Sequence, residues 1–322
     1  MTRRTLLVSL GAGASSLLTG VPVQALAKAI ARASPSFSRE DEAFLEELER
    51  ATFRFFADCA HPATGLVKDR NRVSGADDRE VASIAATGFG LTALCIADKR
   101  GWLRSGEARE RVRTTLQFLR ERMPHEHGFF FHFVNWRTGE REWKCELSSI
   151  DTAILLCGVL TCRRYFRDRQ IQRWAGEIYA RVDWAWMMNC GDLLSHGWKP
   201  ESGFLASRWD TYCEHMMLYL LAIGSRSHPI PASIWHGWKR PWFEYAGLRY
   251  ITPREPIFVH QYSHAWFDFR GRKDRHADYF ENSVLATRAH RAFCAKLAGR
   301  FPHFGDDVWG ITASDSRKGY VV

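Results

Sequence analysis

The sequence lacks tight cysteine pairs, long basic runs and a convincing membrane-spanning segment. Its eight cysteines are scattered through 322 residues with no C-x-x-C pair, which excludes a small disulfide scaffold and offers no zinc motif. The net charge is +9, yet the basic residues stand beside acids, so a nucleic-acid footprint is not indicated. Gly, Ser and Pro interrupt the first apolar stretch, which disfavours a transmembrane helix.

Several familiar catalytic signatures are also absent. The sequence has no G-x-S-x-G elbow, P-loop or dinucleotide fingerprint. Histidines cluster in "HEHGFFFH" and "HQYSH", but neither segment has the H-E-x-x-H spacing of a helical metal site. No close repeat of the solenoid type occurs. Any chemistry must therefore come from other side chains.

The N-terminus has the three regions of an export signal. In "MTRRTLLVSLGAGASSLLTGVPVQALA", Arg3 and Arg4 precede an apolar small-residue stretch that ends in an A-x-A cleavage site. The paired arginines resemble a twin-arginine signal. We expect a signal peptide over 1–27, a linker over 28–38, and a periplasmic or secreted protein that is not inserted in the membrane after signal removal. A short membrane anchor is the alternative.

The remainder predicts an all-α fold with a large core. Hydrophobic residues make up 46% of the chain, and aromatic residues, 13 Trp among them, make up 13%. Such rings fill cores, and they also form the platforms on which sugars stack. Apolar residues recur at helical spacing, which predicts helices at about 38–60, 81–99, 105–122, 148–166, 169–189, 209–223, 231–245 and 275–298. Only 129–136 and 204–208 suggest short strands. A ring of helical hairpins, with functional loops at one end, suits this order.

Two segments place carboxylates at the start of apolar helices. In "KCELSSIDTAILLCGVL", Glu146 precedes a Ser-Ser cap and Asp151 falls in the first helical turn. In "SRWDTYCEHMMLYLLAIGS", Asp210 and Glu214 are four residues apart and would share one helix face. Acids at a helix start also complement the macrodipole, which is the structural alternative for Asp151 and Asp210. A carboxylate deeper in an apolar helix, as expected for Glu214, favours its neutral form and suits a general acid.

An exported, aromatic-rich, helical protein with such carboxylates points toward glycoside hydrolysis. That reaction needs two carboxyl groups: one protonates the leaving oxygen, and the other activates water or attacks the sugar. "GLVKDR" and "DFRGRKD" offer further polar groups for a ligand, although neighbouring Asp and Arg residues commonly form loop salt bridges. Histidines in the aromatic loops could hydrogen-bond to a hydroxylated ligand.

Long blocks of the chain resemble the putative-glucoamylase family, which includes bacterial endo-β-1,2-glucanases. They include "GFFFHFVNWRTGER", "ELSSIDTAILLCG", "GWKPESGFLASRWDTYCEHMMLYLLAIGS" and "HQYSHAWFDFR", and the resemblance runs from Phe53 to the last residue. It implies an (α/α)6 toroid over 39–322, no metal or organic cofactor, and β-glucan hydrolysis with inversion. The helices expected here are too few for six hairpins, so we expect the ring to lack its C-terminal hairpin or hairpins.

The resemblance also suggests site residues. The W-D-x-Y-x-E block of the family falls on 209–214, and its E-x-S-x-I-D-T-A block falls on 146–153. Glu214 is then the general-acid candidate, while Asp151 and Glu146 position water or substrate. Substrate-binding candidates are Asp69, Arg70, His132, Phe133, Trp209, Asp210, Tyr212, His228, Gln261, His264, Asp268 and Arg270. Three alternatives remain: a glucan of another linkage, an inactive carbohydrate-binding protein and, last, a terpene-cyclase-like toroid. A monomer is expected.

Overall fold

The computed structural model describes residues 37–72, 77–253, 256–305, 307–316 and 319–321. The predicted signal peptide over 1–27, and the linker up to residue 36, lie outside the described residues. The chain divides after Asp58 into two units, each of which is described by itself. Within the ranges given above, no helix has both the length and the apolar character that crossing a membrane requires.

The first unit contributes one described helix, α3 (Arg39–Asp58). Its start is capped reciprocally: the Asp41 amide donates to Ser38 Oγ at 3.0 Å, while Ser38 Oγ donates to an Asp41 carboxylate oxygen at 2.8 Å. Glu40, Asp41 and Glu42 place negative charge in the first turn, where the helix dipole favours it. The N-cap predicted at Ser38 is therefore confirmed.

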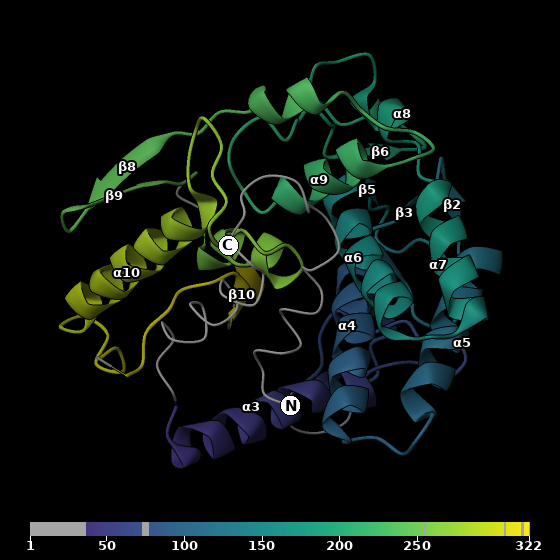
Figure 1. Ribbon diagram of the computed structural model, residues 1–322, viewed down its shortest axis with the longest axis horizontal. Coiled ribbons are helices and arrows are strands. Elements are labelled where there is room, and N and C mark those ends of the chain that lie inside the picture. The colour runs from purple at the N-terminus through teal and green to yellow at the C-terminus, as the bar shows by residue number, and fades with distance from the viewer. Residues whose placement is uncertain (1–36, 73–76, 254–255, 306, 317–318, 322) are drawn as a thin grey trace, which may run out of the picture. The chain divides into compact units, whose positions relative to one another are not determined.

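The second unit is built around two helices in backbone contact. Its α-helices are α4 (Ile84–Arg100), α5 (Glu107–Glu121), α6 (Ser149–Tyr165), α7 (Arg169–Ala180), α8 (Trp184–Met188), α9 (Met216–Gly224) and α10 (Tyr279–Leu297). Helices α4 and α6 lie side by side, and α5 and α7 pack against them (Figure 1). The contact between α4 and α6 depends on glycine: a Cβ atom on Gly158 would lie 2.1 Å from the carbonyl oxygen of Gly88.

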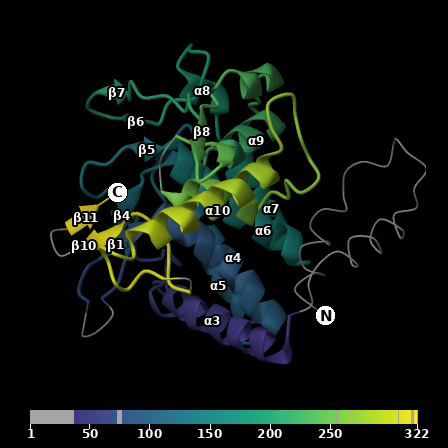
Figure 2. The ribbon, with the colours of Figure 1, turned by 90° about the vertical axis from the view of Figure 1, so that its left-hand side faces the viewer.

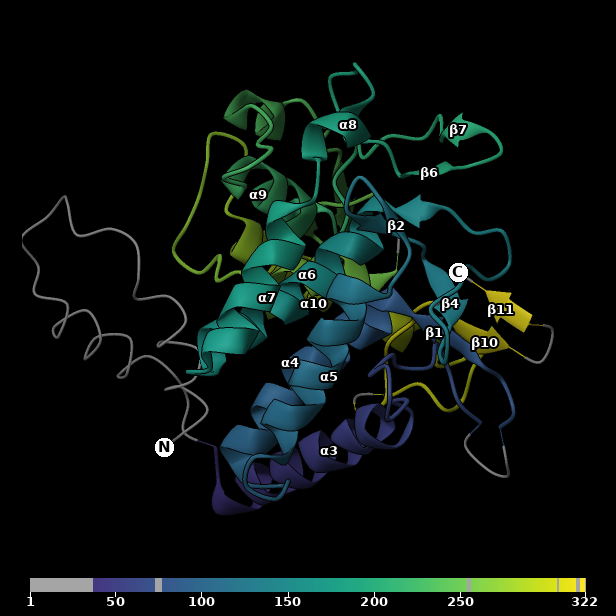
Figure 3. The ribbon, with the colours of Figure 1, turned by 90° about the vertical axis from the view of Figure 1, so that its right-hand side faces the viewer.

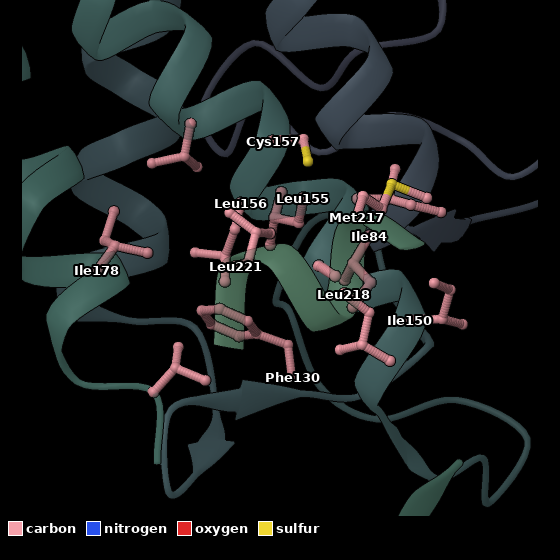
Figure 4. Close-up of a cluster of buried hydrophobic side chains, with 14 of the residues drawn as sticks. Ile84, Phe130, Ile150, Leu155, Leu156, Cys157, Ile178, Met217, Leu218 and Leu221 are labelled. Carbon is pink, nitrogen blue, oxygen red and sulfur yellow. The ribbon is translucent and has the colours of Figure 1, made fainter. Parts of the chain in front are cut away.

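Helix α6 lies in the centre of the core. From Ser149 to Val159 every residue is buried, so the helix has no solvent face in this part. Ile150, Leu155 and Leu156 lie among side chains from α9 and from the strand segment that contains Phe130 (Figure 4). Burial on all sides explains why the sequence of α6 is apolar throughout rather than amphipathic.

Short strands cover the N-terminal ends of α4 and α6. They are β1 (Val81–Ser83), β2 (His125–Glu126), β3 (Phe129–Phe130), β4 (Phe133–Asn135), β5 (Leu147–Ser148), β6 (Gly197–Lys199) and β7 (Gly203–Phe204). All pair antiparallel, in the orders β1-β4, β2-β3 and β5-β6-β7, and Leu147 faces Trp198 across β5 and β6. Strand β1 leads directly into α4 and β5 into α6, so the strands place both helix starts on one side (Figures 2 and 3).

Two further hairpins come from the C-terminal half of the second unit. The hairpin of β8 (Trp242–Tyr245) and β9 (Leu248–Ile251) packs on α10, where the Asn282 side chain bonds to both backbone groups of Ile251 (Figure 1). The hairpin of β10 (Ser314–Ser316) and β11 (Gly319–Val321) lies beside β1 and β4 (Figures 2 and 3). Short 3-10 helices, η1 (Ala232–His236), η2 (Ile257–His260) and η3 (Tyr262–Ala265), connect these parts.

The prediction of an all-α fold is too narrow, because the described chain is mostly helical with short antiparallel sheets. The strands predicted within 129–136 are confirmed as β3 and β4, whereas only the first residue of 204–208 is in a strand. The helix predicted over 231–245 is wrong: η1 ends at His236, and Pro241 precedes β8. Proline disfavours a helix for the residue before it, and the aromatic residues that follow suit a strand.

Two predicted helices are shorter than predicted, one because of a local cap and the other because of a contact with a distant segment. The helix predicted over 169–189 breaks after Ala180, because Asp183 caps a new helix by accepting a hydrogen bond from the Trp186 amide. The helix predicted from 209 begins only at Met216. Before it, the Tyr212 amide donates to the Lys239 carbonyl at 2.8 Å, so the backbone pairs with another segment instead of with itself.

Candidate active site

A carboxylate–imidazole cluster lies at the start of α6. Strand β5 ends at Ser148, which is the N-cap of α6 and accepts a hydrogen bond from the Asp151 amide at 3.2 Å. The same hydroxyl donates to Asp151 Oδ2, so the cap also orients the carboxylate. Asp151 is only 8% exposed, and its other oxygen faces His132. The prediction that Asp151 lies in a first helical turn is confirmed.

His132 joins the two carboxylates of this cluster. Its Nδ1 atom lies 3.1 Å from Glu146 Oε1, and its Nε2 atom lies 3.5 Å from Asp151 Oδ1. The ring is fixed by its backbone, because the His132 amide donates to the Glu146 carbonyl at 3.0 Å. Phe133 stacks on the imidazole at a centroid distance of 3.8 Å. One imidazole thus contacts two carboxylates, one on each ring nitrogen.

The carboxylates and the imidazole of the cluster favour each other's charged forms. Burial disfavours the charged imidazole, but Asp151 and Glu146 outweigh it and raise the pKa of His132 above its ordinary value. In return, the hydrogen bond from His132 lowers the pKa of Glu146. The stabilisation from His132 is present below its unfolded pKa of about 6.5 and is lost as pH rises through the folded value. The stabilisation from Glu146 is present above its unfolded pKa and is lost as pH falls through its lowered value.

Asp151→Asn should lower the pKa of His132. Asp151 is the largest influence that raises this pKa, so burial gains weight once the negative charge is removed. Titration of the His132 ring by NMR, in the parent chain and in the variant, measures the change. Asp192→Asn, at an exposed position, is the matched control, and exposed His228 serves as an internal reference. An unchanged His132 pKa in the Asp151 variant would mean that the cluster does not form in solution.

The cluster could also hold a cation. His132, Glu146 and Asp151 each offer one ligand atom, and these atoms lie within 4.8 Å of one another. One nitrogen and two carboxylate oxygens form a donor set that divalent metals accept. The direct contacts of His132 with both carboxylates are equally those of a metal-free site in which the imidazole holds a proton.

Glu214 lies in the turn that leads into α9. Ser263 Oγ donates to the Glu214 carbonyl at 2.6 Å and accepts from the Met217 amide at 3.0 Å, so a residue of η3 caps this helix. The thiol of Cys213 donates to the Glu214 carboxylate, and the Glu214 side chain is half-buried. Because α9 begins at Met216, the prediction that Asp210 and Glu214 share a helix face is wrong.

Trp209 connects the Glu214 segment to the start of α6. Its Nε1 atom donates to Ser149 Oγ at 2.8 Å, and His196 stacks on its indole at 3.9 Å. Ser149 in turn donates to the backbone carbonyl of Ser195. This contact brings the two predicted carboxylate segments together, although they are far apart in the sequence. Trp209 itself is 8% exposed, so its main role in this arrangement is structural.

Two neighbours of Glu214 are more buried than a ligand-contacting side chain should be. Tyr212 is fully buried, with its hydroxyl 3.1 Å from His260 Nδ1, so it has no surface for a substrate. His215 is also fully buried, and among the described residues neither of its ring nitrogens has a hydrogen-bond partner. Burial lowers the pKa of His215 to about 3. Both residues therefore shape the turn that holds Glu214.

Asp210 is held by a salt bridge at the surface. Lys239 Nζ lies 3.1 Å from Asp210 Oδ2, and Thr211 Oγ1 donates to Oδ1 at 2.9 Å. Burial opposes ionisation, but these contacts lower the pKa of Asp210. Its side chain is 45% exposed, so the carboxylate remains accessible to a ligand while it is ion-paired.

Three of the predicted substrate-binding residues, Asp69, Arg70 and Phe133, lie near the cluster. Arg70 Nε pairs with Asp69 Oδ2 at 2.5 Å and its NH1 atom also pairs with Asp315 of β10. The Asp69 charge helps to raise the pKa of His132. Phe133 packs between His132 and Trp143, whose ring centroid is 4.9 Å from that of Phe133. These aromatic rings form a half-exposed platform beside the carboxylates.

The other predicted binding residues contact different parts of the molecule. His228 follows the C-terminal end of α9, whereas Glu214 precedes its start, so about 13 Å of helix separates them. The structure therefore does not bring these two residues together. His264 bonds to Ser283 of α10 and, with Gln261, lines a separate cavity of about 510 Å³. Asp268 and Arg270 form an exposed ion pair at 2.7 Å, as the structural alternative predicted.

Three further residues of the candidate site, Trp143, His196 and Lys199, were not predicted from the sequence. Trp143 is 62% exposed and extends the platform on Phe133, and the Lys199 charge lowers the pKa of Glu146. His196 stacks on Trp209, and no sequence motif marks this histidine. The only signal was that all three lie in the Gly- and aromatic-rich connectors between helices, where function tends to concentrate.

Comparison with known proteins gives this site a context. The model of the family "Glycoamylase: Putative glucoamylase" matches residues 206–322. The exo β-1,2-glucooligosaccharide sophorohydrolase (non-reducing end) of Parabacteroides distasonis is 26% identical over 330 residues. The match covers 88% of this chain and 44% of that protein, so the chain spans less than half the length of this curated relative.

Two solved structures share the fold. The endo-β-1,2-glucanase from Chitinophaga pinensis, in complex with sophorotriose and glucose, superposes with a TM-score of 0.79 at 28% identity. That match covers 88% of this chain and 74% of the other. The β-1,2-glucanase from Parabacteroides distasonis superposes with a TM-score of 0.78, covering 89% of this chain and 46% of that chain. At 23% identity, the second match shows the fold alone.

The chain is homologous to glycoside hydrolases of β-1,2-glucan. The resemblance to the putative-glucoamylase family, with its endo-β-1,2-glucanases and sophorohydrolase, is confirmed.

Proposed function

We propose that this chain hydrolyses β-1,2-linked glucan by endo attack with inversion of configuration. The observation that carries the proposal is the His132–Glu146–Asp151 cluster, joined through the Trp209–Ser149 hydrogen bond to the segment of Glu214. The likeness to the Chitinophaga pinensis endo-β-1,2-glucanase, which includes three quarters of that chain's length, supports this substrate. We further infer that the helices belong to an (α/α)6 toroid.

Inversion requires an acid and a base on opposite faces of the sugar. In the proposed mechanism Glu214 protonates the glycosidic oxygen of the departing chain. A carboxylate of the cluster, Asp151 or Glu146, accepts a proton from the attacking water, and His132 holds both in place. Inverting enzymes separate the two carboxyl groups by about 6.5–9.5 Å to leave room for that water. The platform of Phe133 and Trp143 offers an apolar face on which a glucose ring can stack.

Export remains a proposal that rests on residues 1–27. The paired Arg3 and Arg4, the apolar stretch and the A-x-A site support delivery to the periplasm or beyond. Fractionation of producing bacteria tests it: the chain should leave the cytoplasm, and substitution of both arginines by lysine should retain it there. Equal export of both forms would remove the twin-arginine assignment.

Release of reducing sugar from three glucans tests the substrate. Linear β-1,2-glucan, β-1,3-glucan and starch are incubated in parallel with the purified chain, and a melting curve is recorded on the same sample. We expect cleavage of β-1,2-glucan alone. Cleavage of starch would favour the α-glucan activity that the name of the family suggests. No cleavage by a cooperatively folded sample would favour an inactive carbohydrate-binding protein.

Exo attack is a second candidate, favoured by the sophorohydrolase relative. An exo enzyme that releases sophorose yields one disaccharide from the first minutes of reaction, whereas an endo enzyme yields a broad mixture of oligosaccharides. Chromatography of early products separates the two outcomes. We expect the mixture.

A further inference from the structure

Three potential metal ligands meet close to the segment that contains Lys239, the ion-pair partner of Asp210. His236 is the last residue of η1, and Asp274 and His276 lie in the loop before α10. His236 Nδ1 lies 3.0 Å from His276 Nε2, and one ligand atom from each of the three residues lies within 4.8 Å of the others. All three side chains are partly exposed, so an ion could reach them from solvent.

We propose that His236, Asp274 and His276 bind a divalent transition-metal ion of the zinc class. In a tetrahedral site with bonds of about 2.0–2.1 Å, neighbouring ligand atoms are separated by about 3.3 Å. The two imidazole nitrogens need to part by only a few tenths of an ångström to reach this separation. Two histidines, one carboxylate and a water molecule make up a familiar zinc donor set.

The Asp274 carboxylate is oriented for this role by its neighbours. Its Oδ1 atom accepts hydrogen bonds from the amides of His276 and Ala277, at 2.7 and 2.9 Å. Its Oδ2 atom accepts from Trp235 Nε1 at 2.7 Å and from the Tyr279 hydroxyl at 3.1 Å. Such surrounding bonds fix the direction of a metal ligand. The ion replaces the longer of the two contacts on Oδ2, and Tyr279 keeps its 2.7 Å bond from Arg240.

Two arginines near the site, Arg240 and Arg275, reduce its affinity for a cation. Arg275 Nε lies 3.3 Å from His276 Nε2 and must turn away, which its exposed position allows. Arg240 is fixed by bonds to the carbonyls of Trp235 and Trp238, so its charge stays near the site. An occupied site would join η1 to the loop before α10. It would thereby support Lys239, which pairs with Asp210 in the neighbouring segment.

Titration of the full chain with cobalt(II) and zinc(II), after treatment with a chelator, tests the proposal. Cobalt should give visible absorption bands of a tetrahedral site, and excess zinc should raise the melting temperature by roughly 5 °C. His276→Gln should weaken binding at least tenfold. His303→Gln, at an exposed histidine outside the cluster, is the matched control and should change nothing.

Two further variants keep the test decisive. Arg275→Ala removes a competing donor and a positive charge, so it should tighten binding several-fold even if His276→Gln folds poorly. His132→Gln distinguishes this site from the carboxylate cluster at α6, because only binding at that cluster is lost in this variant. Equal cobalt affinity in the parent, His276→Gln and Arg275→Ala chains would overturn the proposal. None of these readouts depends on glucan hydrolysis.

Discussion

Glu214→Gln should reduce the turnover of β-1,2-glucan by about 10²–10⁴-fold, the contribution typical of a general acid. Glutamine keeps the size of the side chain but cannot give a proton to the glycosidic oxygen. The fold should be retained, because Ser263 holds the turn through the Glu214 carbonyl and the Met217 amide, and the substitution leaves both backbone groups in place. Initial rates of reducing-sugar release at saturating glucan measure the loss.

A matched control and a second substrate make this result specific. Glu244→Gln, at an exposed position on β8, should leave the rate unchanged. An aryl glycoside with a good leaving group needs little protonation, so Glu214→Gln should lose far less activity on it. Equal losses on both substrates would assign Glu214 to another role, and near-normal turnover of glucan would remove it from the mechanism. Asp151→Asn should slow both substrates, because water activation serves every leaving group.

Helices whose cap and apolar residues are neighbours in the sequence could be predicted. The segment predicted as 148–166 is α6 (Ser149–Tyr165), and its Ser148 cap and apolar run are both local signals. The segment predicted as 209–223 is helical only from Met216, because its first residues pair with Lys239 and are capped by Ser263. Those partners come from other parts of the chain, so no local pattern could reveal them.

The candidate site was predictable in its residue types and not in its geometry. Glu146 and Asp151 flank a cap, and that arrangement is visible in the sequence. His132 approaches them only because the segment between β3 and β4 lies against β5. Similarly, the Trp209–Ser149 bond joins residues sixty positions apart, and the buried Tyr212 hydroxyl contacts His260 of η2, 48 positions further along the chain. Contacts between distant segments therefore decide which of the predicted polar residues can act together.

Gly158→Ala should lower the free energy of unfolding by about 1–3 kcal/mol or more, the range of an overpacked core. The added Cβ would lie 2.1 Å from the Gly88 carbonyl oxygen and 2.9 Å from the Gly88 Cα. These are backbone atoms, so no side chain can move aside, and α4 and α6 must separate. Because α6 is the centre of the core and Ser148 and Asp151 lie at its start, the cluster should loosen too.

Gly176→Ala provides the control with the opposite sign. Gly176 lies inside α7, where the nearest atom to an added Cβ is 3.8 Å away on the flexible Arg163 side chain. Alanine should therefore stabilise the chain by about 0.5–1 kcal/mol, because glycine loses more freedom on entering a helix. Urea unfolding of both variants beside the parent chain gives the two changes. If Gly158→Ala were as well tolerated as Gly176→Ala, the backbones of α4 and α6 would have to lie further apart in solution than in this structure. The placement of Asp151 against His132 would then need another support.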